Sequence, residues 1–156
     1  MNIKQRKNWV SLLTAVDSQQ LYQVTEQLSS EFDVSYKALP QSGLGMLKLR
    51  DGALHEPFYL GEIPISSAWV ELTLANGDKV EGAAQVMDDS HQLAEALAVC
   101  DAVLANQLPG YQQLVSLLEQ AAQKIEQQRR HRKQVMQRTQ VDFSLLDATG
   151  GSDDKN

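Results

Sequence analysis

The sequence predicts an α+β domain with N-terminal helices, then an antiparallel sheet with a hairpin, then two C-terminal helices and an extended tail. Three observations predict this order. Apolar residues recur at helical spacing within residues 9–32 and again within residues 93–125, and they alternate at period two across much of the segment between. The dipeptide Asn76-Gly77, which is favoured in hairpin turns, separates two of the alternating runs. Helices on either side of a run of strands are typical of the α+β class.

The first two helices are predicted from apolar spacing and from a capping motif. The first has an apolar face with spacing i, i+3, i+4 and i+7, formed by Trp9, Leu12, Leu13 and Val16. Basic residues precede this run, but it lacks the small-residue cleavage pattern of a signal peptide, so we expect a cytoplasmic helix. The second is expected near Asp17, because Asp17-x-x-Gln20 resembles a capping box. Its apolar face comprises Leu21, Val24, Thr25, Leu28 and Phe32.

Extended structure is expected from Val34 onward, where the apolar period changes to two. Pro40 and the glycines at 43 and 45 should interrupt the first strand before a second extended run at residues 46–50. A third stretch, residues 57–65, contains Pro64, which cannot donate a hydrogen bond to a neighbouring strand. We therefore expect residues 57–65 to form an edge strand or a bulged strand.

A hairpin is predicted over residues 68–87. A strict two-residue turn at Asn76-Gly77 would place Leu74 opposite Lys79 and mix apolar with polar side chains on one face. Pairing Leu74 with Val80 removes this conflict and requires a loop with an odd number of residues. We therefore expect Gly77 in a left-handed conformation beside a bulge.

Two further helices are expected after the sheet. Asp89-x-x-Gln92 is a possible capping box for the first, whose apolar stripe is Leu93, Leu97, Cys100 and Leu104. Pro109-Gly110 should end it, and the last helix then presents Tyr111, Leu114, Leu118, Ala121, Ala122 and Ile125 on one face. That face turns hydrophilic over residues 126–134. We expect a compact α+β body at residues 1–125, an extended helical arm and docking segment at 126–147, and a disordered tail at 148–156.

Charge is unevenly distributed along the chain. Residues 124–138 hold six basic residues and one acidic residue, a net charge of +5, so the other residues carry −11 of the total of −6. Three interpretations of this basic run are open: a solvated helix face, a nucleic-acid site, or a contact with a protein partner. No aromatic residue is interleaved with the basic ones for base stacking, which disfavours nucleic acid.

The segment that follows the basic run is apolar and alternates at period two. Such a segment can add as a strand to the sheet edge of a partner or lie in a partner's groove. Folding back onto the body of its own chain is the alternative. The predicted partner-binding residues are Arg138, Val141, Phe143, Leu145 and Leu146.

No catalytic, cofactor-binding or metal-binding residue is predicted in this chain. Cys100 lies in an apolar helical stripe, which indicates core packing and, as the single cysteine, fits a reducing compartment. His91 and Glu95 are four residues apart, but two ligands are too few for a metal site. Gly43-Leu44-Gly45 precedes a strand rather than a helix, so it is interpreted as a turn and not as a phosphate loop. Asp88-Asp89 is interpreted as supplying a helix cap rather than an acid–base pair.

Four stretches give the chain a family resemblance: residues 58–62 (FYLGE), 69–72 (WVEL), 94–102 (AEALAVCDA) and 139–143 (TQVDF). Together with the N-terminal helix, their order and spacing resemble the PhnG family, the G subunit of the carbon–phosphorus lyase core complex of bacterial phosphonate breakdown. The resemblance covers nearly the whole chain up to Gly150.

The resemblance implies a scaffold subunit that acts with the H, I and J subunits of the core complex and with an L subunit. The complex forms α-D-ribose 1-methylphosphonate 5-triphosphate from ATP and methylphosphonate and releases adenine. This subunit would bind no cofactor, while ATP, an iron–sulfur cluster and S-adenosylmethionine serve the complex. No nucleic acid and no membrane is implied, and no run approaches the roughly 18 apolar residues of a membrane span. A stand-alone small enzyme and a basic-armed nucleic-acid adaptor are the alternative functions.

Overall fold

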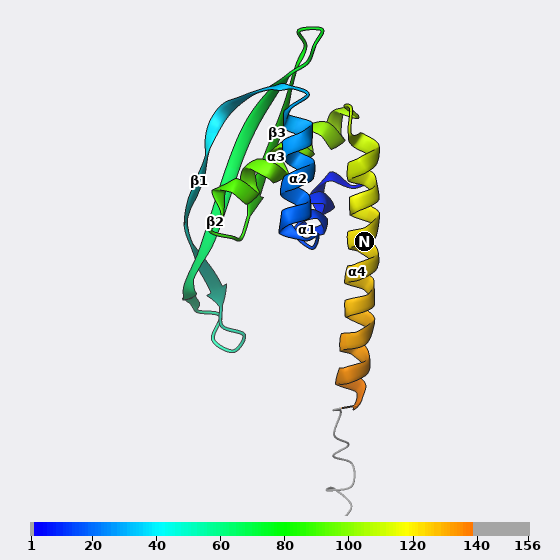
Figure 1. The fold of residues 1–156 in the computed structure, drawn as a ribbon. Coiled ribbons are helices and arrows are strands. Elements are labelled where there is room, and N and C mark those ends of the chain that lie inside the picture. The colour runs from blue at the N-terminus through cyan, green and yellow to red at the C-terminus, as the bar shows by residue number, and fades with distance from the viewer. Residues whose placement is uncertain (1, 139–156) are drawn as a thin grey trace, which may run out of the picture. The chain divides into compact units, whose positions relative to one another are not determined.

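The protein has the predicted α+β fold (Figure 1), and a computed structural model describes residues 2–138. The described chain contains, in order, η1 (Arg6–Asn8), α1 (Trp9–Leu13), α2 (Ser18–Ser29), β1 (Asp33–Arg50), β2 (Pro57–Thr73), β3 (Lys79–Val86), α3 (His91–Asn106) and α4 (Tyr111–Arg138). The chain divides into two compact units, residues 1–123 and 124–156, and α4 runs from the first into the second.

The sheet is antiparallel, with the order β1-β2-β3. The hairpin loop between β1 and β2 and the loop between β2 and β3 lie at opposite ends of β2 (Figure 1). Strand β3 pairs only with residues 66–73 of β2, whereas β1 pairs with β2 along its whole length. Residues 43–50 and 57–65 therefore form a two-stranded extension of the sheet, which together with its loop at 51–56 is called the ribbon below.

Strand β1 is continuous, so the predicted interruption at Pro40, Gly43 and Gly45 is wrong. Pro40 lies in a bulge between the paired positions Ala38 and Gln41. Residues in a bulge are not paired across the strands, so the missing N–H group of Pro40 costs no hydrogen bond. Gly43 and Gly45 are paired within the strand rather than forming a turn, and an added Cβ at Gly45 would overlap the side chain of Ile65. Pairing with β2 thus overrides the local preference of these residues for a break.

Strand β2 confirms the prediction of an edge and bulged strand around Pro64. Pro64 pairs with Leu44 in the ribbon, where β1 is the only strand beside β2. A bulge places Leu60 between the paired residues Tyr59 and Gly61. Gly61 there has φ +155°, a conformation that side chains disfavour.

The hairpin between β2 and β3 has the predicted odd loop but a different register. Leu72, not Leu74, pairs with Val80, and the Leu74 N–H donates to the Asp78 carbonyl at 2.8 Å. Gly77 is left-handed (φ +86°), and its N–H donates to the Leu74 carbonyl, as expected for a three-residue loop with a bulge. Both registers keep apolar residues on one face, so alternation does not distinguish them.

Helix α3 forms the centre of the body. It packs against all three strands, and α1 and α2 pack against it, so its residues 96–104 are buried on every side. Its N-cap is Ser90, whose hydroxyl accepts the Leu93 N–H at 3.1 Å, so the prediction of Asp89 as the cap is wrong. The predicted cap of α2 is confirmed, because the Asp17 carboxylate accepts the N–H groups of Gln19 and Gln20.

The remaining core comes from the other helices and from strand β2. Its largest fully buried side chains outside α3 are Leu12, Leu13, Leu21, Leu28, Val70, Leu72, Leu114 and Leu118. Helix α3 ends at the left-handed Gln107 (φ 52°), and Gly110 (φ +88°) leaves room for the side chain of Leu28 before α4 begins. The predicted helix break at Pro109-Gly110 is thereby confirmed.

Candidate interaction surfaces

The predicted docking segment lies beyond the part of the chain that the structure describes. Val141, Phe143, Leu145 and Leu146 are outside the described residues, and Arg138 is described only as the last residue of α4. Their role in partner binding stays a prediction. The same holds for the predicted disordered tail at 148–156.

The basic run of α4 is described up to residue 137 and is exposed from residue 126 onward. Arg130 Nε donates to Glu126 Oε1 at 3.1 Å across one helical turn. Val135 and Met136 are 46% and 58% exposed near the end of the described helix. This stretch therefore presents positive charge and a small apolar contact on one helical segment.

Cys100 packs in the core, as predicted. The residue is fully buried, and its Sγ lies 3.7 Å from the Thr25 hydroxyl. Burial raises the pKa of the Cys100 thiol to about 12, because the thiolate would lose its hydration inside the body. A thiol in that state is a poor nucleophile at neutral pH.

We expect Cys100 to be protected from thiol reagents in the folded chain. At pH 8, labelling by 5,5′-dithiobis(2-nitrobenzoic acid) should be slower than in denaturant by on the order of a thousandfold, since it requires opening of the body. Unfolding restores a pKa near 9.0, so the unfolded chain loses its thiol proton first and stability should fall between pH 9 and about 12. A Leu54→Cys variant, at a position 75% exposed, should label rapidly as the control. Rapid labelling of the unmodified chain would contradict the burial.

The turn that carries the adjacent acidic residues Asp88 and Asp89 makes structural contacts. Asp88 Oδ1 accepts the Ser90 N–H at 2.8 Å at the entry to α3. The carbonyl oxygens of Asp88 and Asp89 accept the hydroxyls of Ser66 and Ser42, which lie 2.8 Å apart. Within residues 2–138, no group of three or more His, Cys, Asp or Glu side chains could hold a metal ion. The Asp88-Asp89 turn thus joins the sheet to α3.

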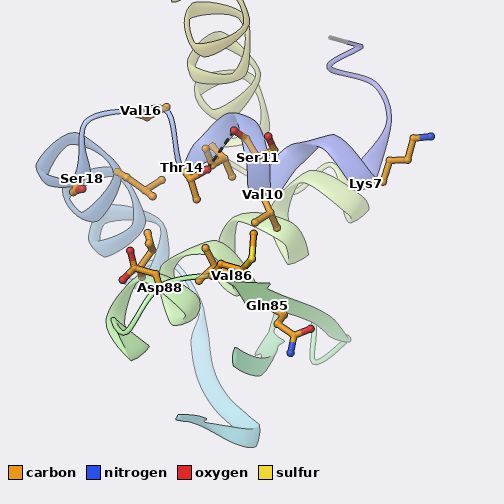
Figure 2. Close-up of a pocket in the computed structure, with 13 residues that line it drawn as sticks. Lys7, Val10, Ser11, Thr14, Val16, Ser18, Gln85, Val86 and Asp88 are labelled. Atoms are coloured by element: carbon orange, nitrogen blue, oxygen red, sulfur yellow. Dashed lines mark hydrogen bonds between the residues drawn. The ribbon is translucent and has the colours of Figure 1, made fainter. Parts of the chain in front are cut away.

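A cavity of about 520 Å³ lies between α1, the start of α2, the end of β3 and α3 (Figure 2). This volume is typical of small-molecule sites, which add a few convergent polar groups to an apolar lining. Here Val10, Val16 and Val86 contribute apolar surface, and Lys7 points away from the cavity in Figure 2. The Thr14 hydroxyl donates to the Ser11 carbonyl at 3.2 Å. Ser18, Gln85 and Asp88 also line the cavity, so its lining is mixed, and the Asp88 carboxylate already accepts the Ser90 N–H.

The ribbon carries exposed apolar side chains that the sequence analysis did not identify as a surface. Seven large ones are between 38% and 75% exposed: Leu44, Met46, Leu49, Leu54, Phe58, Tyr59 and Leu60. A signal was present in the sequence, because apolar residues stand next to each other at 46–47 and 58–60. Consecutive positions of a strand point to opposite faces, so such runs predict apolar groups on both faces.

The outer face of the sheet, next to the ribbon, carries a closed charge network. Lys79 Nζ lies 2.7 Å from Glu71 Oε1, and Lys37 Nζ bridges Glu71 at 3.0 Å and Glu81 at 3.1 Å. The hydrogen bond from Lys79, followed by that from Lys37, lowers the pKa of Glu71. Trp69 Nε1 donates to Glu81 at 3.0 Å and remains 45% exposed. Two cations and two anions therefore neutralise one another around an exposed aromatic ring.

A protein-family model matches most of this chain. The family model of the phosphonate metabolism protein PhnG matches residues 4–147. The chain belongs to the PhnG family. The match includes the exposed ribbon, the basic part of α4 and the predicted docking residues.

Membership in the PhnG family gives the chain a role in phosphonate metabolism. The family is a subunit of the phosphonate lyase complex, so partner chains are implied. No curated protein matches the chain at the similarity required to count as a relative. Within residues 2–138, every helix is too short or too polar to cross a membrane.

Proposed function

We propose that this member of the PhnG family is a non-catalytic scaffold subunit of the carbon–phosphorus lyase core complex. It would support the formation of α-D-ribose 1-methylphosphonate 5-triphosphate from ATP and methylphosphonate, with release of adenine. Its partners would be the H, I and J subunits, together with the L subunit for activity. The family match over residues 4–147 is the observation that carries the proposal.

The chemistry of the described residues supports a scaffold role. Displacing adenine from ribose requires protonation of the leaving group and a site for a triphosphate. In the described chain, the Asp88 carboxylate accepts a backbone N–H, the Cys100 thiol is buried, and Lys7 points away from the cavity between α1 and β3. Under this proposal ATP, the iron–sulfur cluster and S-adenosylmethionine belong to other subunits, and this chain contributes by ordering them.

A truncation tests the proposal. Deleting residues 138–156 should dissociate the chain from the other subunits in a co-purification assay, because it removes all the predicted partner-binding residues. The melting temperature of the isolated chain should change by less than about 2 °C, since the core lies within residues 1–123. Deleting only residues 148–156 is the matched control and should leave the complex intact.

Two results would contradict the scaffold proposal. One is an intact and fully active complex after deletion of residues 138–156. The other is turnover of ATP and methylphosphonate by the purified chain alone, which would make it a stand-alone enzyme.

A further inference from the structure

The ribbon exposes seven large apolar side chains on only two strands and their loop. Its seven exposed side chains average more than half exposure. At about 200 Å² for a large side chain, they present roughly 800 Å² of apolar area. Divided between the two faces this is about 400 Å² a face, within the roughly 300–600 Å² of the largest apolar patch of a typical monomer. One partner in a stable complex contributes about 800 Å² to the interface, so the ribbon alone has the area of a complete binding surface.

Both faces of the ribbon carry exposed apolar side chains. On one face, Leu49 pairs with Phe58 and Gly45 pairs with Ile63. The opposite face carries Leu44 and Tyr59 together with the charged residues Lys48, Arg50 and Glu62, and the Lys48 ammonium lies 5.8 Å from the centre of the Tyr59 ring. A two-stranded hairpin is marginally stable by itself, so both faces gain from being covered. A flat partner surface covers only one of them.

The β2 edge of the ribbon is protected against pairing with another strand. Pro57 and Pro64 lie near the two ends of the ribbon segment of β2, and the bulge at Leu60 lies between them. On β1, the bulge at Pro40 precedes the ribbon. Prolines and bulges are features that prevent addition of a strand to a sheet edge. The exposed apolar side chains therefore place the partner contact on the two faces of the ribbon.

The charge of the ribbon is nearly balanced. Residues 43–65 hold two basic and three acidic residues, a net charge of −1. The adjoining outer face of the sheet is neutralised internally by Lys37, Lys79, Glu71 and Glu81. A complementary surface is therefore apolar and carries little net charge, unlike a nucleic acid or a highly charged protein.

We propose that the ribbon inserts into an apolar, weakly charged cleft of a different protein subunit of the phosphonate lyase complex. This inference rests on the proposed scaffold function and adds a second contact, separate from the predicted docking residues 138–146. A second copy of this chain is disfavoured as the occupant. In a two-fold dimer each ribbon covers one face of the other and leaves the opposite face in water.

Paired serine substitutions on each face test the insertion. Leu44→Ser with Tyr59→Ser changes one face, and Leu49→Ser with Phe58→Ser changes the other. Each pair should reduce the partner subunits that co-purify with the full chain by at least about tenfold, because each removes apolar area from the interface centre. Leu39→Ser is the matched control, since Leu39 is 71% exposed, like Leu44 at 70%, but lies outside the ribbon. Circular dichroism melts of the isolated variants establish that the body is folded.

Crosslinking from the ribbon loop provides a test that leaves both faces intact. A photo-crosslinker attached to a Leu54→Cys variant should capture a different subunit, because Leu54 is 75% exposed in that loop. Ala75→Cys, in the exposed loop at the opposite end of β2, is the control and should not capture that subunit. The buried Cys100 should not react in either variant.

The outcomes of these experiments distinguish the cleft from a flat contact, from a second copy of the chain and from failure of the scaffold function. Loss of partners on changing only one face would overturn the cleft in favour of a flat contact. Dimerisation of the purified chain that is abolished by the ribbon variants would assign the surface to a second copy. Ribbon variants that keep their partners, while deletion of residues 138–156 loses them, would overturn the ribbon inference and leave the scaffold function standing. Failure of the unmodified chain to associate with any subunit of the complex would overturn the scaffold function itself.

Discussion

Replacing Gly82 by alanine should destabilise the body by about 3 kcal/mol, although it adds only one methyl group. Gly82 is buried in β3 where the strand crosses α3. An added Cβ would overlap the carbonyl oxygen of Ala98 and lie 2.5 Å from the backbone nitrogen of Ala102. Backbone atoms of a central helix cannot move aside as a side chain can, so α3 must shift from the sheet. For a chain of this size the melting temperature should fall by about 6–12 °C.

Gly43→Ala is the matched control for Gly82→Ala. Gly43 lies in a strand of the same sheet, and no atom outside its immediate neighbours lies within 4 Å of an added Cβ. Its substitution should change the free energy of unfolding by less than about 0.5 kcal/mol. Chemical denaturation of both variants gives the comparison. Equal stabilities for the two would show that the contact between β3 and α3 is looser than the structure describes.

The helices could be predicted from the sequence because their signals are local. The Asp17 cap, the break at Pro109-Gly110 and the stripe containing Leu97 and Cys100 each depend on residues a few positions apart. The cap of α3 was misplaced by one residue, since Asp89 and Ser90 are both good caps. The turn before α3 determines which of the two caps the helix. In that turn Asp88 accepts the Ser90 N–H, and the Ser90 hydroxyl caps the helix.

The strands were harder to predict because their limits depend on distant partners. Pro40 and Gly43 favour a break locally, yet pairing with β2 carries the strand through both. In the β2–β3 hairpin, Leu72 rather than Leu74 meets Val80, and a three-residue loop sets this register. Alternation cannot choose between two registers that keep the same residues on the same face.

The two proposed interaction surfaces differ in the same way in how far the sequence predicts them. Residues 139–146 are predicted to be a docking segment because an apolar, alternating stretch follows a basic run directly in the sequence. The ribbon joins residues 43–50 to residues 57–65, and its exposure follows from the length of β3, which ends before reaching it. Sequence patterns can show that a strand is apolar on both sides, but whether another element covers it depends on the folded topology.

Replacing Asp101 by alanine should cost about 2–4 kcal/mol of stability. Asp101 is buried on α3 and joins three parts of the body. Its Oδ2 accepts the Ala83 N–H at 3.1 Å, which satisfies a backbone donor of the edge strand β3. Its two oxygens also accept the Arg6 guanidinium, at 2.8 Å from Nε and 2.6 Å from the terminal nitrogen. Alanine would remove all three contacts and leave the Ala83 donor without its side-chain acceptor.

A double-mutant cycle with Arg6→Ala separates the ion pair from the backbone contact. Arg6 has a side chain that is 60% exposed, so its removal should cost only about 1 kcal/mol. The double variant should be hardly less stable than Asp101→Ala, because the partner of Arg6 is already missing. The exposed pair Glu126 and Arg130 is the control, with an expected coupling energy of about 0.3–0.5 kcal/mol. Additive losses for Arg6 and Asp101 would mean that their bidentate contact contributes nothing, and that Asp101 stabilises the body through the edge of β3 alone.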